Sequence, residues 1–440
     1  MSEPPASPVR MVSGKPSREA LAQLDRHWRL RYLMLAPHRL GFWAAMVVLV
    51  LCGAWWALVQ TDRMTGALGL SYALSPSLLH ATVMVFGFMP LFFTGFLFTA
   101  APKWLKVEPW PTAQLLAPVL LQVLGWLLWL VGGHVHAAVA LAGLACAALG
   151  LVWVCALFWL LVLRSSAPDQ LHARMVGMAF MAGSLALLGS WLALVLDAPL
   201  FARALVLTGL WGFVVVVFVT VAHRMIPFFT SSAMPLTQVW RPFWALWLML
   251  ATAVLEAAAV WVEFDGPLDD SIAAAWMLLR GALELGAGAV LVWLAVVWGM
   301  VQSPKNRLLA MLHIGFLWLG LSLLLAGASQ WLGLAQGTPA MPLAALHALT
   351  MGCLASLMLA MVTRVACGHG GRALVADSIA WSLFWLLQLA TLLRIAAALP
   401  SAASAWMLWA AALLWLGVMA VWGVRLGAWF GRVRVDGRPG

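Results

Sequence analysis

The chain has 440 residues, of which 64% are hydrophobic and only 9% are charged. Soluble domains carry about 25% charged residues, so this composition excludes a water-soluble globular protein. The formal net charge is +10, but the basic residues lie in short segments between apolar runs, so we interpret them as topology signals. The expected partner is therefore the lipid membrane and not a nucleic acid.

Residues 1–39 are predicted to form a basic cytoplasmic N-terminal tail. This segment is polar and contains no short apolar core of the kind that a cleavable signal peptide requires. Near its end Trp28 and Leu30 alternate with Arg29 and Arg31. That pattern is typical of a short helix lying in the membrane interface, which we place at 21–39.

Residues 40–426 are predicted to form an all-α polytopic membrane domain. Apolar runs of about 20 residues, each long enough to cross a ~30 Å hydrocarbon core, fill this region almost end to end. Residues 427–440 then form a basic cytoplasmic C-terminal tail. The twelve expected spans are 40–60, 77–100, 112–132, 137–163, 173–196, 203–227, 242–262, 272–300, 307–332, 343–365, 376–398 and 402–424.

The charges between the spans predict the orientation of the chain. With the N-terminus in the cytoplasm, 21 of the 25 Lys and Arg residues fall in cytoplasmic segments. The four that do not are Arg63, Arg203, Arg280 and Arg394. Because positive residues concentrate on the cytoplasmic side of membrane proteins, both termini are expected there.

Two histidines occupy matching positions in the second and tenth spans. His80 and His347 lie at the same expected depth near the outer end, and a methionine, Met84 or Met351, follows each by one helical turn. Polar side chains at membrane depth are costly and mark functional sites. Neutral imidazole is a strong ligand for haem iron, so we interpret this pair as a clamp for a haem between two helices. The methionines are interpreted mainly as packing residues.

A second set of histidines is predicted toward the cytoplasmic side. His223 ends the sixth span, His313 lies about two turns into the ninth, and His369 is expected in the loop after the tenth. Three imidazoles from different helices could hold copper or a second haem. The basic residues Arg224, Arg364 and Arg372 could neutralise haem propionates. An alternative stays open, in which these residues end helices and face lipid headgroups.

Buried carboxylates form a further candidate group. Glu284 follows Arg280 by one turn in the eighth span, so this pair could neutralise itself. Glu256 in the seventh span has no partner nearby in the sequence. Structural pairing and a proton path through Glu256 and Glu284 are both open interpretations.

Seen together, these motifs resemble the NnrS family of bacterial inner-membrane proteins, which contain haem and copper and are linked to nitric oxide stress. The resemblance covers nearly the whole membrane domain. One departure is His223, because many relatives have glycine before the equivalent of Arg224, which makes His223 a weaker inherited ligand. The matching segments are 80–87, 95–104, 224–230, 312–318, 346–352, 361–364 and 368–372.

The resemblance implies a multi-pass protein of the bacterial inner (cytoplasmic) membrane that binds or reductively converts nitric oxide or a similar small ligand. The expected cofactors are haem b, for which His80 and His347 are axial ligands, and copper. The chain has no CxxCH motif for covalent haem attachment. A haem with two axial histidines has no open coordination position, so catalysis is expected at His313 and His369. Electrons would come from quinol or a soluble donor.

Two other classes of function stay open at this stage. Twelve spans are also ordinary for a secondary transporter or a metal or haem exporter, although the sequence has few intramembrane charges and no convincing repeat. A non-catalytic haem-based sensor is the third interpretation. A looser likeness to the catalytic subunit of haem–copper oxidases and nitric oxide reductases rests on histidines in the second and tenth spans. With Tyr32 and Tyr72 as its two tyrosines, the chain lacks the usual oxidase centre, so this likeness assigns no reaction.

Overall fold

The computed structural model describes residues 27–234, 240–264 and 270–437. These described residues are helical and contain no strand. Twelve of their helical segments are long and apolar enough to cross a membrane. The predicted all-α class and the number of spans are therefore confirmed, while the predicted tail before residue 27 lies outside the described residues.

The spanning helices follow one another along the chain with short connections. Their bounds are α2 (Pro37–Thr65), α3 (Pro76–Phe86) with α4 (Met89–Leu105), α5 (Ala113–Val135), α6 (Ala137–Arg164), α7 (Leu171–Val195), α8 (Pro199–Gly209) with η2 (Leu210–Val215) and α9 (Val216–Ala233), α10 (Phe243–Val262), α11 (Asp270–Val297), α12 (Arg307–Leu332), α13 (Pro342–His347) with η5 (Ala348–Ala355) and α14 (Ser356–His369), α15 (Ser378–Ala396) and α16 (Ser404–Phe430). Short helices η1 (Leu30–Leu35), η3 (Ser303–Lys305) and η4 (Leu334–Gln336) lie between or before them.

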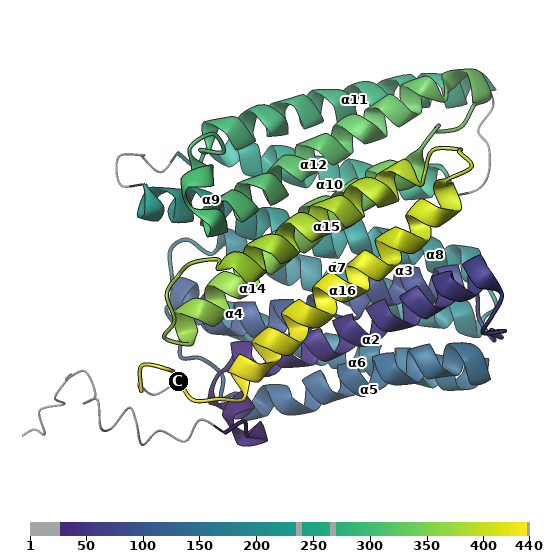
Figure 1. The fold of residues 1–440 in the computed structure, drawn as a ribbon. Coiled ribbons are helices and arrows are strands. Elements are labelled where there is room, and N and C mark those ends of the chain that lie inside the picture. Colours follow the sequence, from purple (N-terminus) through teal and green to yellow (C-terminus); the bar gives the residue numbers. More distant parts are fainter. Residues whose placement is uncertain (1–26, 235–239, 265–269, 438–440) are drawn as a thin grey trace, which may run out of the picture.

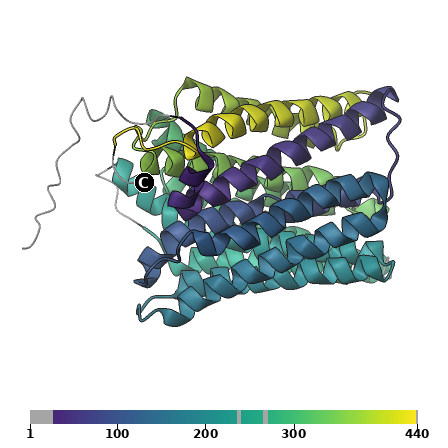
Figure 2. The ribbon, with the colours of Figure 1, turned by 90° about the horizontal axis from the view of Figure 1, so that it is seen from below.

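The helices form one bundle in which their axes run roughly side by side (Figures 1 and 2). The pair α11 and α12 lies at one edge and the pair α5 and α6 at the opposite edge (Figure 1). Glycines allow close contact within these pairs: a Cβ on Gly288 of α11 would lie 2.8 Å from the carbonyl oxygen of Gly320 of α12. Small residues at such contacts let membrane helices pack by van der Waals interactions.

The first and last spans, α2 and α16, pack against each other (Figure 2). The Nη1 of Arg39 donates to the carbonyl oxygens of Phe430, at 3.2 Å, and Arg432, at 2.7 Å. In the described part of the chain before α2 there is one short 3₁₀ helix, η1, and α16 continues to Phe430. The membrane helices therefore extend a few residues into both segments that the sequence assigned to tails.

Three of the described spans are interrupted. The second span breaks at Gly87 and Phe88, just before Pro90, which has no N–H to continue the helix. The sixth and tenth spans each contain a π-helical segment, η2 and η5. Hydropathy depends on apolar composition and not on the hydrogen-bond register, so it cannot predict the π-helical segments.

Candidate functional site

An apolar cavity brings His80 and His347 together, as the sequence predicted. The cavity lies near the end of the bundle where α2 ends and α3 begins, which we call the His80 end. Side chains of the second, sixth, tenth, eleventh and twelfth spans form its walls, and one from α2. The lining residues are Trp56, His80, Ala81, Met84, Val85, Phe88, Met89, Val206, Leu207, Leu210, Val214, Leu346, His347, Thr350, Met351, Leu354, Arg394, Leu408, Ala411, Ala412 and Trp415.

All three interrupted spans contribute to this cavity. The break between α3 and α4 supplies Phe88 and Met89, and η2 supplies Leu210 and Val214. The other π-helical segment, η5, supplies Thr350, Met351 and Leu354. Single π-helical turns occur frequently at functional sites. All three interruptions border this cavity, and this marks it independently of the histidines.

His80 faces the cavity without a hydrogen bond to hold it. Its ring stacks on the indole of Trp56, with 3.8 Å between ring centroids and 18° between planes. Its Nδ1 is buried and has no hydrogen-bond partner among the described residues. A buried polar nitrogen without a partner is energetically unfavourable, so this imidazole is well suited to bind an additional group.

His347 is held in one orientation by its own helix. Its Nδ1 lies 2.8 Å from the carbonyl oxygen of Leu343. A carbonyl only accepts, so Nδ1 must carry the proton and the lone pair lies on Nε2. Such a hydrogen bond fixes the tautomer and ring orientation of histidines that ligate metals. The two histidines therefore differ, since His347 is anchored and His80 is held by stacking alone.

Arg394 of α15 also lines the cavity, and sequence reasoning did not select it as a site residue. It is half-buried, and none of the ion pairs between described residues involves it. The signal was present in the sequence, because a lone arginine inside an apolar span marks a functional position. Arg394 gives this otherwise apolar cavity one positive charge that could meet an anionic group.

His223 lies near the opposite end of the bundle, where it pairs with a histidine of α7 and has no nitrogen left for a metal. Its Nε2 lies 3.1 Å from the carbonyl oxygen of Pro242, so Nε2 carries the proton. Its Nδ1 lies 3.1 Å from Nε2 of His172 and accepts a hydrogen bond from it. This arrangement agrees with the departure of His223 from the family pattern.

His313 and His369 contact residues other than those that contact His223. Nε2 of His313 lies 3.0 Å from Oγ1 of Thr230, which itself donates to the carbonyl of Ile226. His313 is therefore the donor to Thr230, and its buried Nδ1 has no partner. His369 is the last residue of α14 and not part of a loop, and its ring centroid lies 4.5 Å from that of His38.

The structure does not gather the three inner histidines into one site. Within the parts of the chain that it describes, no group of three or more His, Cys, Asp or Glu side chains is placed to hold a metal ion. Because each span can rotate about its axis, equal depth in the sequence does not bring side chains together. The interpretation of His223, His313 and His369 as one shared centre has no support in this geometry.

The three arginines assigned to the inner site stack on aromatic rings and do not line the His80–His347 cavity. The guanidinium of Arg224 lies 5.0 Å from the ring centroid of Trp104. The corresponding distance is 4.0 Å for Arg364 and Phe229 and 4.1 Å for Arg372 and Trp429. Cation–π contacts of this kind stabilise the ends of membrane helices.

Comparison with known proteins supports the family resemblance. The model of the family described as NnrS protein matches residues 32–434, which is nearly the whole chain. A search of curated proteins returns no match. The matched region contains every spanning helix and the complete His80–His347 cavity. The chain therefore belongs to the NnrS family.

Proposed function

We propose that the protein is a haem-binding membrane protein of the nitric oxide response, in which His80 and His347 are the axial ligands of a b-type haem. The convergence of the two histidines on one apolar cavity is the observation that carries the proposal. In this proposal the protein lies in the bacterial inner membrane with both termini in the cytoplasm, so that the cavity is near the outer face.

The residues around the cavity suit a haem in their chemistry. Both imidazoles can offer a nitrogen, the walls are almost entirely apolar, and Arg394 can pair with a propionate. The volume of the cavity is about 150 Å³. A porphyrin therefore enters only if wall side chains move, and the flexible methionines Met84 and Met351 are the ones suited to do so.

The two histidines would have unequal roles toward a small ligand. Haem supplies an iron that binds nitric oxide when one axial position is open. His347 is anchored by Leu343, whereas His80 has no hydrogen bond, so His80 is the side chain that would give way. This arrangement serves a sensor or an oxidoreductase equally, and an oxidoreductase would take electrons from quinol or a soluble donor.

Copper, the second cofactor that the family resemblance implies, has weaker support. Since His223, His313 and His369 lie apart, copper would bind there through fewer than three of them or after a rearrangement. For this reason we place the binding of nitric oxide at the His80–His347 cavity and not at the inner histidines.

The test is the optical spectrum of the purified full-length protein and of three variants. We expect a Soret band in the wild type, and its loss or a shift of the reduced bands in His80→Ala and His347→Ala. His172→Ala is the matched control, since it removes a buried histidine far from the cavity and should leave the spectrum unchanged. Absence of haem from the wild type, or wild-type spectra in both cavity variants, would overturn the proposal.

A further inference from the structure

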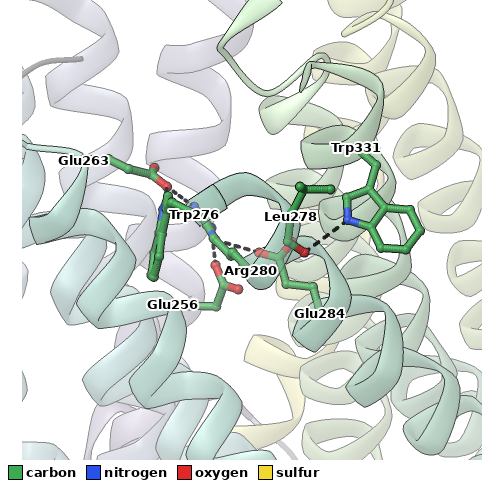
Figure 3. Close-up of polar contacts among 7 residues, drawn as sticks. All are labelled: Glu256, Glu263, Trp276, Leu278, Arg280, Glu284 and Trp331. Atoms are coloured by element: carbon green, nitrogen blue, oxygen red, sulfur yellow. Dashed lines mark hydrogen bonds and ion pairs between the residues drawn. The ribbon is translucent and has the colours of Figure 1, made fainter. Parts of the chain in front are cut away.

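A second cavity at the His80 end contains one arginine that pairs with three carboxylates (Figure 3). Nε of Arg280 donates to Glu284 at 2.8 Å, and its Nη2 donates to Glu256 at 2.6 Å. Its Nη1 donates to Glu263, which also accepts a hydrogen bond from Nε1 of Trp276 at 3.0 Å. The expected pairing of Arg280 with Glu284 is confirmed, and Glu256 has the same partner.

Two of these carboxylates are buried, and the hydrogen bonds of Arg280 leave part of each unsatisfied. The side chain of Glu284 is 0% exposed and that of Glu256 is 5% exposed. Oε2 of Glu284 and Oε1 of Glu256 have no donor among the described residues. Both carboxyl groups bind the guanidinium of Arg280 and therefore lie close to each other. Two neighbouring carboxylates cannot hydrogen-bond to each other unless one of them carries a proton.

Gln330, in the same cavity, also has a buried oxygen without a hydrogen-bond donor among the described residues. Gln330 of α12 lines the cavity and is 3% exposed, yet its Oε1 has no donor. The cavity has a volume of about 610 Å³, and its rim includes the exposed residues Arg203 and Glu263. Glu256 and Gln330 therefore each bring a buried acceptor oxygen to a cavity that reaches the surface, which suits water and exchangeable protons.

The charges of the cavity can be balanced by one proton. Arg280, Glu256 and Glu284 are its largely buried charged residues, whereas Arg203 and Glu263 are exposed to solvent. With the three buried groups ionised, one positive charge faces two negative ones. A single proton on the Glu256–Glu284 pair makes the group neutral and gives the pair the donor that it lacks, as expected for two carboxyl groups that share a buried site.

We propose that Glu256 and Glu284 share one exchangeable proton and form a proton-binding site that communicates with the surface through the cavity beside Gln330. The site is next to the His80–His347 cavity, because Leu207 and Leu346 line both. The proposed proton site does not require bound haem. If the proposed function also holds, the protons are stored next to the cavity in which a reduction would consume them.

A metal cation is a poorer occupant of this site than a proton. The guanidinium of Arg280 already lies between the carboxylates and would repel a cation placed among them. No group of potential ligands among the described residues is arranged for a metal ion. A proton needs no coordination shell and can reside on either carboxyl group.

Infrared spectroscopy of the full-length protein in detergent tests the proposal. Around neutral pH we expect a carbonyl stretching band of a protonated carboxyl group that shifts in heavy water and disappears at high pH. Glu284→Gln and Glu256→Gln should each abolish this band, because the remaining carboxylate is then paired with Arg280 alone. Glutamine keeps the volume and an acceptor for Arg280, which favours folding.

Glu263→Gln is the matched control, since it alters the exposed member of the same cluster and should leave the band in place. A wild-type protein without the band would overturn the proposal, and so would a band that persists in both buried variants. The pH titration of the wild-type band decides the question even if the variants do not fold. Haem content, measured on the same samples, should not change in Glu284→Gln, which separates this proposal from the proposed function.

Discussion

At the His80 end of the bundle, two histidines with available ring nitrogens face a single cavity, whereas His223 at the opposite end is fully engaged by its neighbours. Nδ1 of His80 has no partner among the described residues, and His347 is anchored through one nitrogen only. In contrast, His223 uses both nitrogens, toward His172 and Pro242. A free nitrogen aimed into a cavity therefore distinguishes a candidate ligand from a structural histidine, and the residue type alone does not.

The strongest challenge to this comparison is to remove the anchored and the unanchored histidine separately. We expect His347→Ala to lower the haem-to-protein ratio about 10-fold or more, because ligand and orienting hydrogen bond are lost together. His80→Ala should retain more haem, with an open position that binds carbon monoxide in the reduced protein. Equal haem loss in both variants, measured by haem extraction, would contradict the asymmetry.

The next largest effect should come from the charge in the cavity. Arg394→Gln should weaken haem retention by about 10-fold, since a charge-assisted hydrogen bond contributes about 1.5–3 kcal/mol. Arg394→Lys should restore most of the retention because it keeps the charge. The control is Arg364→Gln at the opposite end, where the guanidinium lies over Phe229. Haem transfer to an apo-acceptor protein measures both, and equal effects would refute the role of Arg394.

A smaller effect is expected at the inner histidines, where we predict a structural role. His313→Leu removes the donor to Thr230 and should lower the free energy of unfolding by about 1 kcal/mol, with haem content unchanged. His313→Gln can still donate to Thr230 and should recover part of the loss. Thermal unfolding in detergent gives the comparison. A loss of bound copper with no loss of stability would instead make His313 a ligand.

The smallest effect should come from an ion pair between spans at the same inner end. Arg425 donates to Asp377, and this hydrogen bond is the main reason that the pKa of Asp377 is lowered to about 2. A lowered carboxyl pKa contributes stability above its ordinary value of about 4 and loses it as the pH falls toward 2. Since Asp377 is half-exposed, screening limits the contribution to about 1 kcal/mol or less.

Asp377→Asn reveals this contribution. The difference in melting temperature between wild type and variant should be present at neutral pH and shrink as the pH falls toward 2. A difference that stays constant with pH would assign the effect to the N-cap of α15, where Asp377 also accepts from the backbone N–H of Ala380.

Much of the fold and part of the site could be predicted from the sequence. Spans such as 307–332 agree with the structure because length and hydropathy alone define a membrane crossing. The pairing of His80 with His347 was also accessible, since both lie at the same depth near span ends. Their agreement in depth and in local sequence was enough to propose one site.

The side-chain contacts that the sequence did not predict depend on how each helix is rotated and on which helices are neighbours. The apparent group of His223, His313 and His369 separates because depth says nothing about helix rotation. Conversely, Glu256 receives its partner from α11, and Arg394 reaches the cavity from a span that the sequence does not connect with His80. Such contacts between distant spans are decided by packing, which hydropathy does not encode.

The π-helical segment η5 has a consequence for which changes in chain length the protein can tolerate. An α-helix turns by about 100° per residue. One extra residue within a turn therefore rotates all preceding side chains about the helix axis relative to the following ones. Leu343 and Leu349 line the acidic cavity, whereas His347 and Thr350 line the other one. Deleting one residue from Ala348–Ala355 would rotate His347 away from His80. In this span a single-codon deletion should be more damaging than most substitutions.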